Sequence, residues 1–198
     1  MRFLAFIGVL AICVAIAGGI YFYGGYYDVA ASATGNSAVD WSLRNVRRAS
    51  INRHFNAPSP PAWFSTPKAV EAGAHEFAEE GCVRCHGAPG RKPDKFALGL
   101  DPNPPDLGKA TKDDPPAKVF WTVKNGIRMT GMPAFGKHMH DDEIWRAVAF
   151  AQHESEVTPM QYEQWSGKDE KGEASEGKES GLGGGTGKPA PVNGAPAK

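Results

Sequence analysis

The chain has 198 residues, which is enough for one ordinary domain with appended segments. Lys and Arg together number 22, as do Asp and Glu, so the formal charge is zero and the composition gives no reason to expect a nucleic-acid partner. The 24 glycines and 16 prolines predict a large share of loop and tail, and the three cysteines do not suit a disulfide framework.

The N-terminal segment, residues 1–27, is apolar and uncharged from Phe3 to Tyr23. At about 1.5 Å rise per residue, a helix of this length spans roughly 30 Å, the thickness of the hydrocarbon core of a bilayer. Arg2 precedes the run, which predicts a single-pass anchor with the rest of the chain outside the cytoplasm. A cleaved signal peptide is the alternative, because Ala31-Ser32-Ala33 resembles a cleavage site, but the length of the apolar run favours the anchor.

Residues 28–65 show no sustained periodicity and are expected to be a periplasmic linker. Within them, residues 41–52 could form a short amphipathic helix whose arginines contact lipid head groups, or they could be a solvated basic linker. The second interpretation is favoured here. Pro58, Pro60 and Pro61 then stiffen the chain before the folded part.

A folded, all-α domain is expected over residues 66–165. Thr66 and Pro67 are a typical helix start, and Gly81 is a typical helix end. Residues 87–116 are rich in Pro and Gly and predict an ordered loop. Further helices are expected over residues 116–125 and from about residue 140 onward, with the apolar stripes Ala69, Val70, Gly73, Phe77 and Ala78 in the first helix and Ile144, Trp145, Val148 and Ala149 in the last. Residues 166–198 contain almost no large apolar side chain and predict a disordered tail.

One motif indicates the chemistry. Cys82-Val83-Arg84-Cys85-His86 is a C-x-x-C-H sequence, in which two thiols three residues apart can form thioethers to the vinyl groups of one haem. His86 then lies under the iron as an axial ligand. A zinc ribbon would need a second C-x-x-C, and a thioredoxin-like pair would need flanking strands, so the motif predicts one covalent haem c per chain.

The second axial ligand is expected from the Gly- and Pro-rich segment, residues 126–136. A methionine held in such a loop can reach the iron from the opposite face, and Met132 and Met129 both lie there. His138, His140 and an open sixth position are the other possibilities.

The order of these features resembles the class I cytochrome c family, and more loosely its membrane-anchored bacterial mono-haem members. The resemblance rests on C-x-x-C-H after a short helix, the segment Gly131-Met132-Pro133-Ala134-Phe135 and a final amphipathic helix. It implies a cytochrome c fold of three to four helices around one haem, with Met132 as the sixth ligand. It also implies close helix crossing at Gly73, aromatic packing between Phe77 and Phe150, and a carbonyl of Pro104 or Pro105 that accepts a hydrogen bond from His86.

The same resemblance implies a one-electron carrier rather than an enzyme, located at the bacterial cytoplasmic (inner) membrane with the haem domain facing the periplasm or cell exterior. Its partners would be redox proteins of respiration: a quinol-oxidising complex, a terminal oxidase or a dehydrogenase. Two alternatives remain: a cytochrome subunit of a larger oxidoreductase complex, and a haem enzyme or sensor with an open sixth site.

Overall fold

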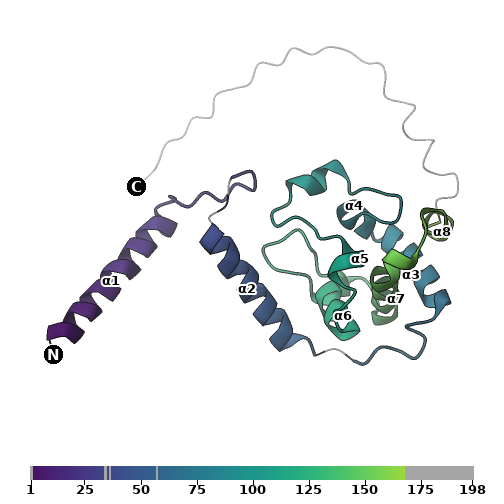
Figure 1. Ribbon diagram of the computed structural model, residues 1–198, viewed down its shortest axis with the longest axis horizontal. Coiled ribbons are helices and arrows are strands. Elements are labelled where there is room, and N and C mark those ends of the chain that lie inside the picture. The colour runs from purple at the N-terminus through teal and green to yellow at the C-terminus, as the bar shows by residue number, and fades with distance from the viewer. Residues whose placement is uncertain (1, 34, 36, 57, 168–198) are drawn as a thin grey trace, which may run out of the picture. The chain divides into compact units, whose positions relative to one another are not determined.

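The computed structural model describes residues 2–33, 35, 37–56 and 58–167, and in this part of the chain every regular element is a helix (Figure 1). One isolated bridge between Ala88 and Arg91 is the exception to helical structure in these ranges. The all-α prediction is therefore confirmed. The tail predicted over residues 166–198 lies outside the described residues from residue 168 onward.

Helix α1 (Arg2–Tyr23) contains the apolar N-terminal run without interruption. It is long and apolar enough to cross a membrane, with a mean hydropathy of 2.7, although a signal sequence has the same properties. The rings of Tyr21, Phe22 and Tyr27 pack edge to face or tilted against one another at its C-terminal end. Such an aromatic cluster suits the polar boundary of a bilayer, so the helix is compatible with membrane anchoring.

Helix α2 (Ser37–His54) corrects the prediction for the segment that follows. The favoured interpretation, a linker without helical structure over residues 41–52, is wrong for the backbone. The segment contains neither Gly nor Pro, and it carries Asp40 in its first turn and Arg53 in its last, which is the charge order that the helix dipole favours. The helix was hard to recognise in the sequence because its apolar periodicity is weak. In the structure Trp41 and Val46 are exposed, so no packed apolar face is needed to explain this helix.

Helices α3 (Pro67–Glu79) and α7 (Asp141–His153) pack against each other and form the centre of the domain. The Thr66 hydroxyl accepts a hydrogen bond from the Ala69 N–H at 3.2 Å, which confirms the predicted N-cap. Gly73 faces α7 so closely that a Cβ there would collide with the carbonyl oxygen of Arg146. The small residue thus permits the crossing, as expected.

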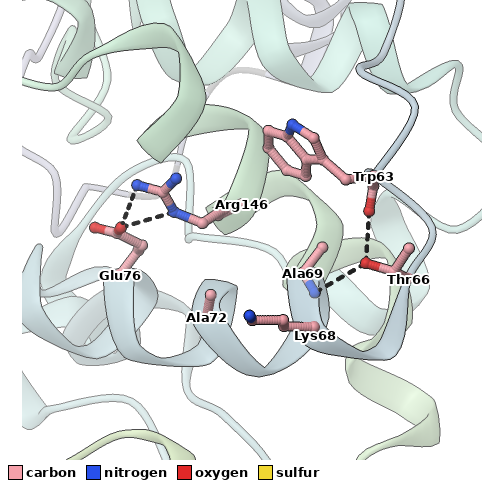
Figure 2. A pocket seen from close by; sticks show the side chains of 7 residues that line it. All are labelled: Trp63, Thr66, Lys68, Ala69, Ala72, Glu76 and Arg146. Carbon is pink, nitrogen blue, oxygen red and sulfur yellow. Dashed lines mark hydrogen bonds and ion pairs between the residues drawn. The ribbon is translucent and has the colours of Figure 1, made fainter.

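An ion pair and an aromatic pair add to this crossing. Arg146 of α7 donates from Nε and Nη2 to Glu76 Oε1 of α3, at 3.0 and 2.8 Å, in a partly buried position (Figure 2). The rings of Phe77 and Phe150 lie 5.1 Å apart, and Phe150 also stacks on Tyr162. Aromatic contacts of this kind stabilise beyond the area that they bury.

The remaining elements surround this pair. They are α4 (Cys82–His86), η1 (Lys95–Gly99), α5 (Leu107–Ala110), α6 (Pro116–Asn125), η2 (Phe135–Lys137), η3 (Glu154–Glu156) and α8 (Pro159–Trp165). The bounds of α6 agree with the prediction, while the loop predicted over residues 87–116 contains two short helices. Helix α8 was not predicted, although Thr158 and Gln161 form a capping box and Pro159 follows the N-cap, which marks its start in the sequence.

Two apolar clusters make up the core. The first contains Phe64, Ala69, Val119, Phe120, Phe135, Met139, Ile144, Trp145, Val148 and Ala149, and the second contains Val70, Ala74, Phe77, Phe150, Val157 and Tyr162. In the first, Phe120 of α6 stacks on Trp145 with ring centres 4.2 Å apart. Cys82 packs against both clusters, so the C-x-x-C-H turn lies where the two halves of the core meet.

Candidate functional site

The C-x-x-C-H motif forms the short helix α4 between two glycines. Gly81 and Gly87 have φ angles of +75° and +76°, a left-handed conformation that only glycine adopts at low cost. The turn between them places Cys82 and Cys85 three residues apart, and hence on one side of a helical turn. Both cysteines are half-buried and neither is in a disulfide.

His86 has a defined orientation. Its Nδ1 lies 2.8 Å from the carbonyl oxygen of Pro105, and because a carbonyl only accepts, Nδ1 carries the hydrogen and donates it. The other ring nitrogen, Nε2, therefore has a free lone pair, which is the form that ligates a metal. Burial lowers the pKa of His86, while the hydrogen bond to Pro105 acts in the opposite direction. Of the two prolines expected for this bond, the structure selects Pro105.

The Pro105 loop is tied to helix α7. After Pro105, the chain enters α5, and the Thr111 hydroxyl beyond that helix lies 2.9 Å from the carbonyl oxygen of Leu107 and 3.2 Å from that of Ala151. The side chain of Gln152 donates at 2.8 Å to the carbonyl oxygen of Thr111. Sequence reasoning missed Thr111 and Gln152, and no local pattern reveals them because about 40 residues separate the partners.

Cys82 lies in an apolar environment that suits a neutral sulfur. Burial raises the pKa of the Cys82 thiol to about 12, and the nearby carboxylate of Glu80 acts in the same direction. These surroundings therefore disfavour the charged thiolate form of Cys82. A thioether, which has no charge, is compatible with the same surroundings.

Of the two candidate methionines, the structure directs only Met132 inward. Met132 is half-buried and packs against the first core cluster, which Cys82 also contacts. Met129 is 85 % exposed and has a φ of +59°. The histidine candidates are at the surface: His138 Nε2 lies 2.8 Å from a carboxylate oxygen of Glu80, and His140 is the N-cap of α7.

The donors present fit a covalently attached haem. They comprise two unpaired thiols, one imidazole with a free nitrogen and one inward thioether, which are the groups that hold haem c and its iron. In the described part of the chain, no group of three or more His, Cys, Asp or Glu residues could hold another metal ion. His86, Cys82, Cys85 and Met132 are thus the residues that would hold the cofactor.

An open groove also occurs among the described residues, and Figure 2 shows the side chains that line it. It runs along α3 and is lined by Trp63, Thr66, Lys68, Ala69, Ala72, Glu76 and Arg146. None of the predicted site residues contributes to it. Glu76 and Arg146 are engaged in their ion pair and Thr66 in the N-cap of α3, so much of the polar lining serves the helix crossing.

An all-α domain with a glycine-flanked C-x-x-C-H turn and an oriented histidine defines a c-type cytochrome domain. A comparison with protein families agrees: residues 68–150 match the family model described as "Cytochrome C oxidase, cbb3-type, subunit III". This segment is a c-type cytochrome domain, as the resemblance to class I cytochromes c implied, and a domain of this family carries covalently bound haem c. No curated protein and no solved structure gives a significant match to the chain.

Proposed function

We propose that the chain is a one-electron carrier in which haem c, attached through Cys82 and Cys85, has His86 and Met132 as its axial ligands. The observation that carries this proposal is the orientation of His86, whose Nδ1 donates to Pro105 and leaves Nε2 free. The inward position of Met132 and the outward position of Met129 support the second ligand.

Each residue has a definite task in this proposal. When bound, the haem supplies an iron that gains and loses one electron. Pro105 holds the ring of His86 in one tautomer, and the loop that contains Pro105 is held by α7. Met132 would supply the second ligand to the iron and so leave no open position for a substrate. The aromatic side chains of the core exclude water, which limits rearrangement when the charge on the site changes.

The absorption spectrum of the oxidised protein tests the assignment of ligands. Methionine ligation gives a weak charge-transfer band at the red end of the spectrum, and we expect this band at neutral pH. A high-spin spectrum without the band would exclude Met132 as a ligand. The alternative of a haem enzyme or sensor with an open sixth site would then replace the carrier.

The surroundings of the carrier also belong to the proposal. Helix α1 would anchor it in the bacterial inner membrane with the haem domain in the periplasm, near a quinol-oxidising complex, a terminal oxidase or a dehydrogenase. We expect the full chain to fractionate with membranes, and a form without residues 1–27, exported by a cleavable signal, to be soluble and to contain haem. A soluble native protein that begins near residue 34 would show a cleaved signal instead.

A second candidate function is a cytochrome subunit of a larger oxidoreductase complex. The description of the matching family favours it, because that model represents a subunit of an oxidase. Purification from membranes in mild detergent distinguishes the two: a free carrier is recovered alone, whereas a subunit is recovered with stoichiometric partner proteins.

A further inference from the structure

The loop that presents Met132 is closed at its base. Gly126 ends helix α6 with a φ of +65°, and a Cβ at this position would lie 2.6 Å from the carbonyl carbon of Pro133. The two ends of the loop therefore touch, and only glycine fits. The Ile127 N–H donates to the carbonyl oxygen of Met132 at 3.2 Å and adds a backbone bond across the base.

Thr130 connects the same two residues from inside the loop. Its hydroxyl donates to the carbonyl oxygen of Ile127 at 2.7 Å and accepts from the Met132 N–H at 3.2 Å. A hydroxyl can do both at once because it carries one hydrogen and two lone pairs. The main chain of Met132 is thus held to Ile127 twice, once directly and once through Thr130.

One residue of the loop has an unfavourable backbone conformation. Met129 adopts a left-handed φ of +59°, which is unfavourable for a residue with a long side chain. In the absence of the hydroxyl, the Met132 N–H and the Ile127 carbonyl would each lose a partner.

We propose that Thr130 is a positioning residue for Met132. Its hydroxyl holds the loop closed, so that the side chain of Met132 stays directed into the core and resists displacement from the iron. The proposal rests on the proposed function, in which Met132 is the sixth ligand. It assigns to Thr130 a role that concerns the sixth position and leaves the His86 side of the site unchanged.

Imidazole can compete with Met132 for the sixth position of the haem iron, so its affinity measures how readily Met132 is displaced. The oxidised, haem-loaded full chain in detergent is titrated with imidazole, and binding is followed by the change in the absorption spectrum. In Thr130→Val the hydroxyl is replaced by a methyl group of similar size, and we expect the affinity for imidazole to rise about tenfold, the effect of losing hydrogen bonds of ordinary strength. Thr130→Ala changes the affinity in the same direction without adding bulk. Thr130→Ser retains the hydroxyl, and its affinity should be within about twofold of the wild type.

Thr122→Val is the matched control, because the Thr122 hydroxyl donates to the Lys118 carbonyl at 2.9 Å within α6, outside the loop. We expect wild-type affinity for imidazole in this variant. Amide hydrogen exchange over residues 126–134 gives a second readout and should be faster in Thr130→Val only.

Wild-type affinity and exchange in Thr130→Val would overturn the positioning role, and so would an equal rise in affinity in Thr122→Val, which would indicate general loosening. Met132→Ala separates this from a failure of the proposed function. If Met132→Ala leaves the affinity for imidazole unchanged, Met132 is not the ligand and both proposals fail. If Met132→Ala raises the affinity strongly and Thr130→Val does not, only the role of Thr130 is wrong.

Discussion

The two sides of the haem site are built in different ways. His86 is adjacent to Cys85 in a turn of five residues, so the proposed attachment points and the proposed first ligand are brought together by the covalent chain. Met132 lies 46 positions beyond His86, in a loop that no covalent attachment connects to the site. The first side is set by neighbours in the chain, whereas the fold of the domain decides where the second lies relative to the first.

The two sides also differ in what holds them. The His86 side is bonded outward, from Pro105 through its loop to helix α7. The Met132 side is bonded mainly to itself, through Ile127 and Thr130. A self-bonded loop can open without unfolding the domain, so we expect the Met132 side to be the one that opens first.

The largest expected effect is on the His86 side. Replacement of Cys82 and Cys85 together by Ala removes both attachment points, and we expect complete loss of covalently bound haem and of most of the stability, because in so small a domain the haem forms part of the core. Acid-acetone extraction followed by haem staining of a denaturing gel measures the covalently bound haem. Cys13→Ala, in the exposed helix α1, is the control and should stain like the wild type. Haem that survives extraction in the double variant would contradict covalent attachment at these residues.

The next effect concerns the Met132 side. Met132→Ala removes the soft thioether that we propose as the sixth ligand, and we expect the reduction potential to fall and the reduced protein to bind carbon monoxide readily. Met129→Ala should do neither, because the Met129 side chain is exposed. Potentiometric titration and carbon monoxide difference spectra measure the two properties. If the two variants exchange their behaviour, the ligand is Met129.

Gly73→Ala tests whether the crossing of α3 and α7 supports both sides. A Cβ at Gly73 would collide with the Arg146 carbonyl oxygen and lie 2.9 Å from the Cβ of Phe150, so the helices must separate. We expect a loss of about 3 kcal/mol in the free energy of unfolding, which is typical of overpacking. Denaturant titration measures it, with Gly99→Ala as the control because no atom lies within 4 Å of a Cβ there. An unchanged midpoint for Gly73→Ala would show that the crossing is looser than described.

The smallest effect is a pH dependence next to the Pro105 loop. Burial raises the pKa of Glu154 from 4.5 to about 7, the Asp106 carboxylate adds to this, and one Glu154 oxygen is buried without a hydrogen-bond partner. A raised carboxyl pKa means that the folded state binds more protons than the unfolded state between these values, so stability falls as the pH rises from 4.5 to about 7.

In Glu154→Gln the fall in stability with rising pH should disappear. Because Glu154 is only partly buried, we expect the variant to gain about 1 kcal/mol over the wild type from the acidic to the neutral end of that window. Thermal unfolding at several pH values measures the difference. Glu156→Gln, which alters an exposed residue of the same short helix, should follow the wild-type curve. A variant curve parallel to that of the wild type would place Glu154 in contact with solvent.

Sequence patterns were sufficient where the signal is local. The N-cap at Thr66, the bounds of α6, the apolar stripe of α7 and the small residue at Gly73 all follow from capping rules or from a period of 3.6 residues. Helix α2 was judged wrongly because its apolar residues do not line one face, while its backbone preference depends on the absence of Gly and Pro. Helix α8 was overlooked although its capping box is present.

The sequence by itself determined the class of chemistry, because the spacing of Cys82, Cys85 and His86 has one strong chemical meaning and its geometry is set within a single turn. Only the tertiary structure decided between Pro104 and Pro105, and only it directed Met132 inward and Met129 outward. The physical reason is the same in both cases. Two nearby residues of the same type have the same chemistry. They differ in the direction in which the folded loop points each group, and that direction depends on bonds to residues far away in the chain.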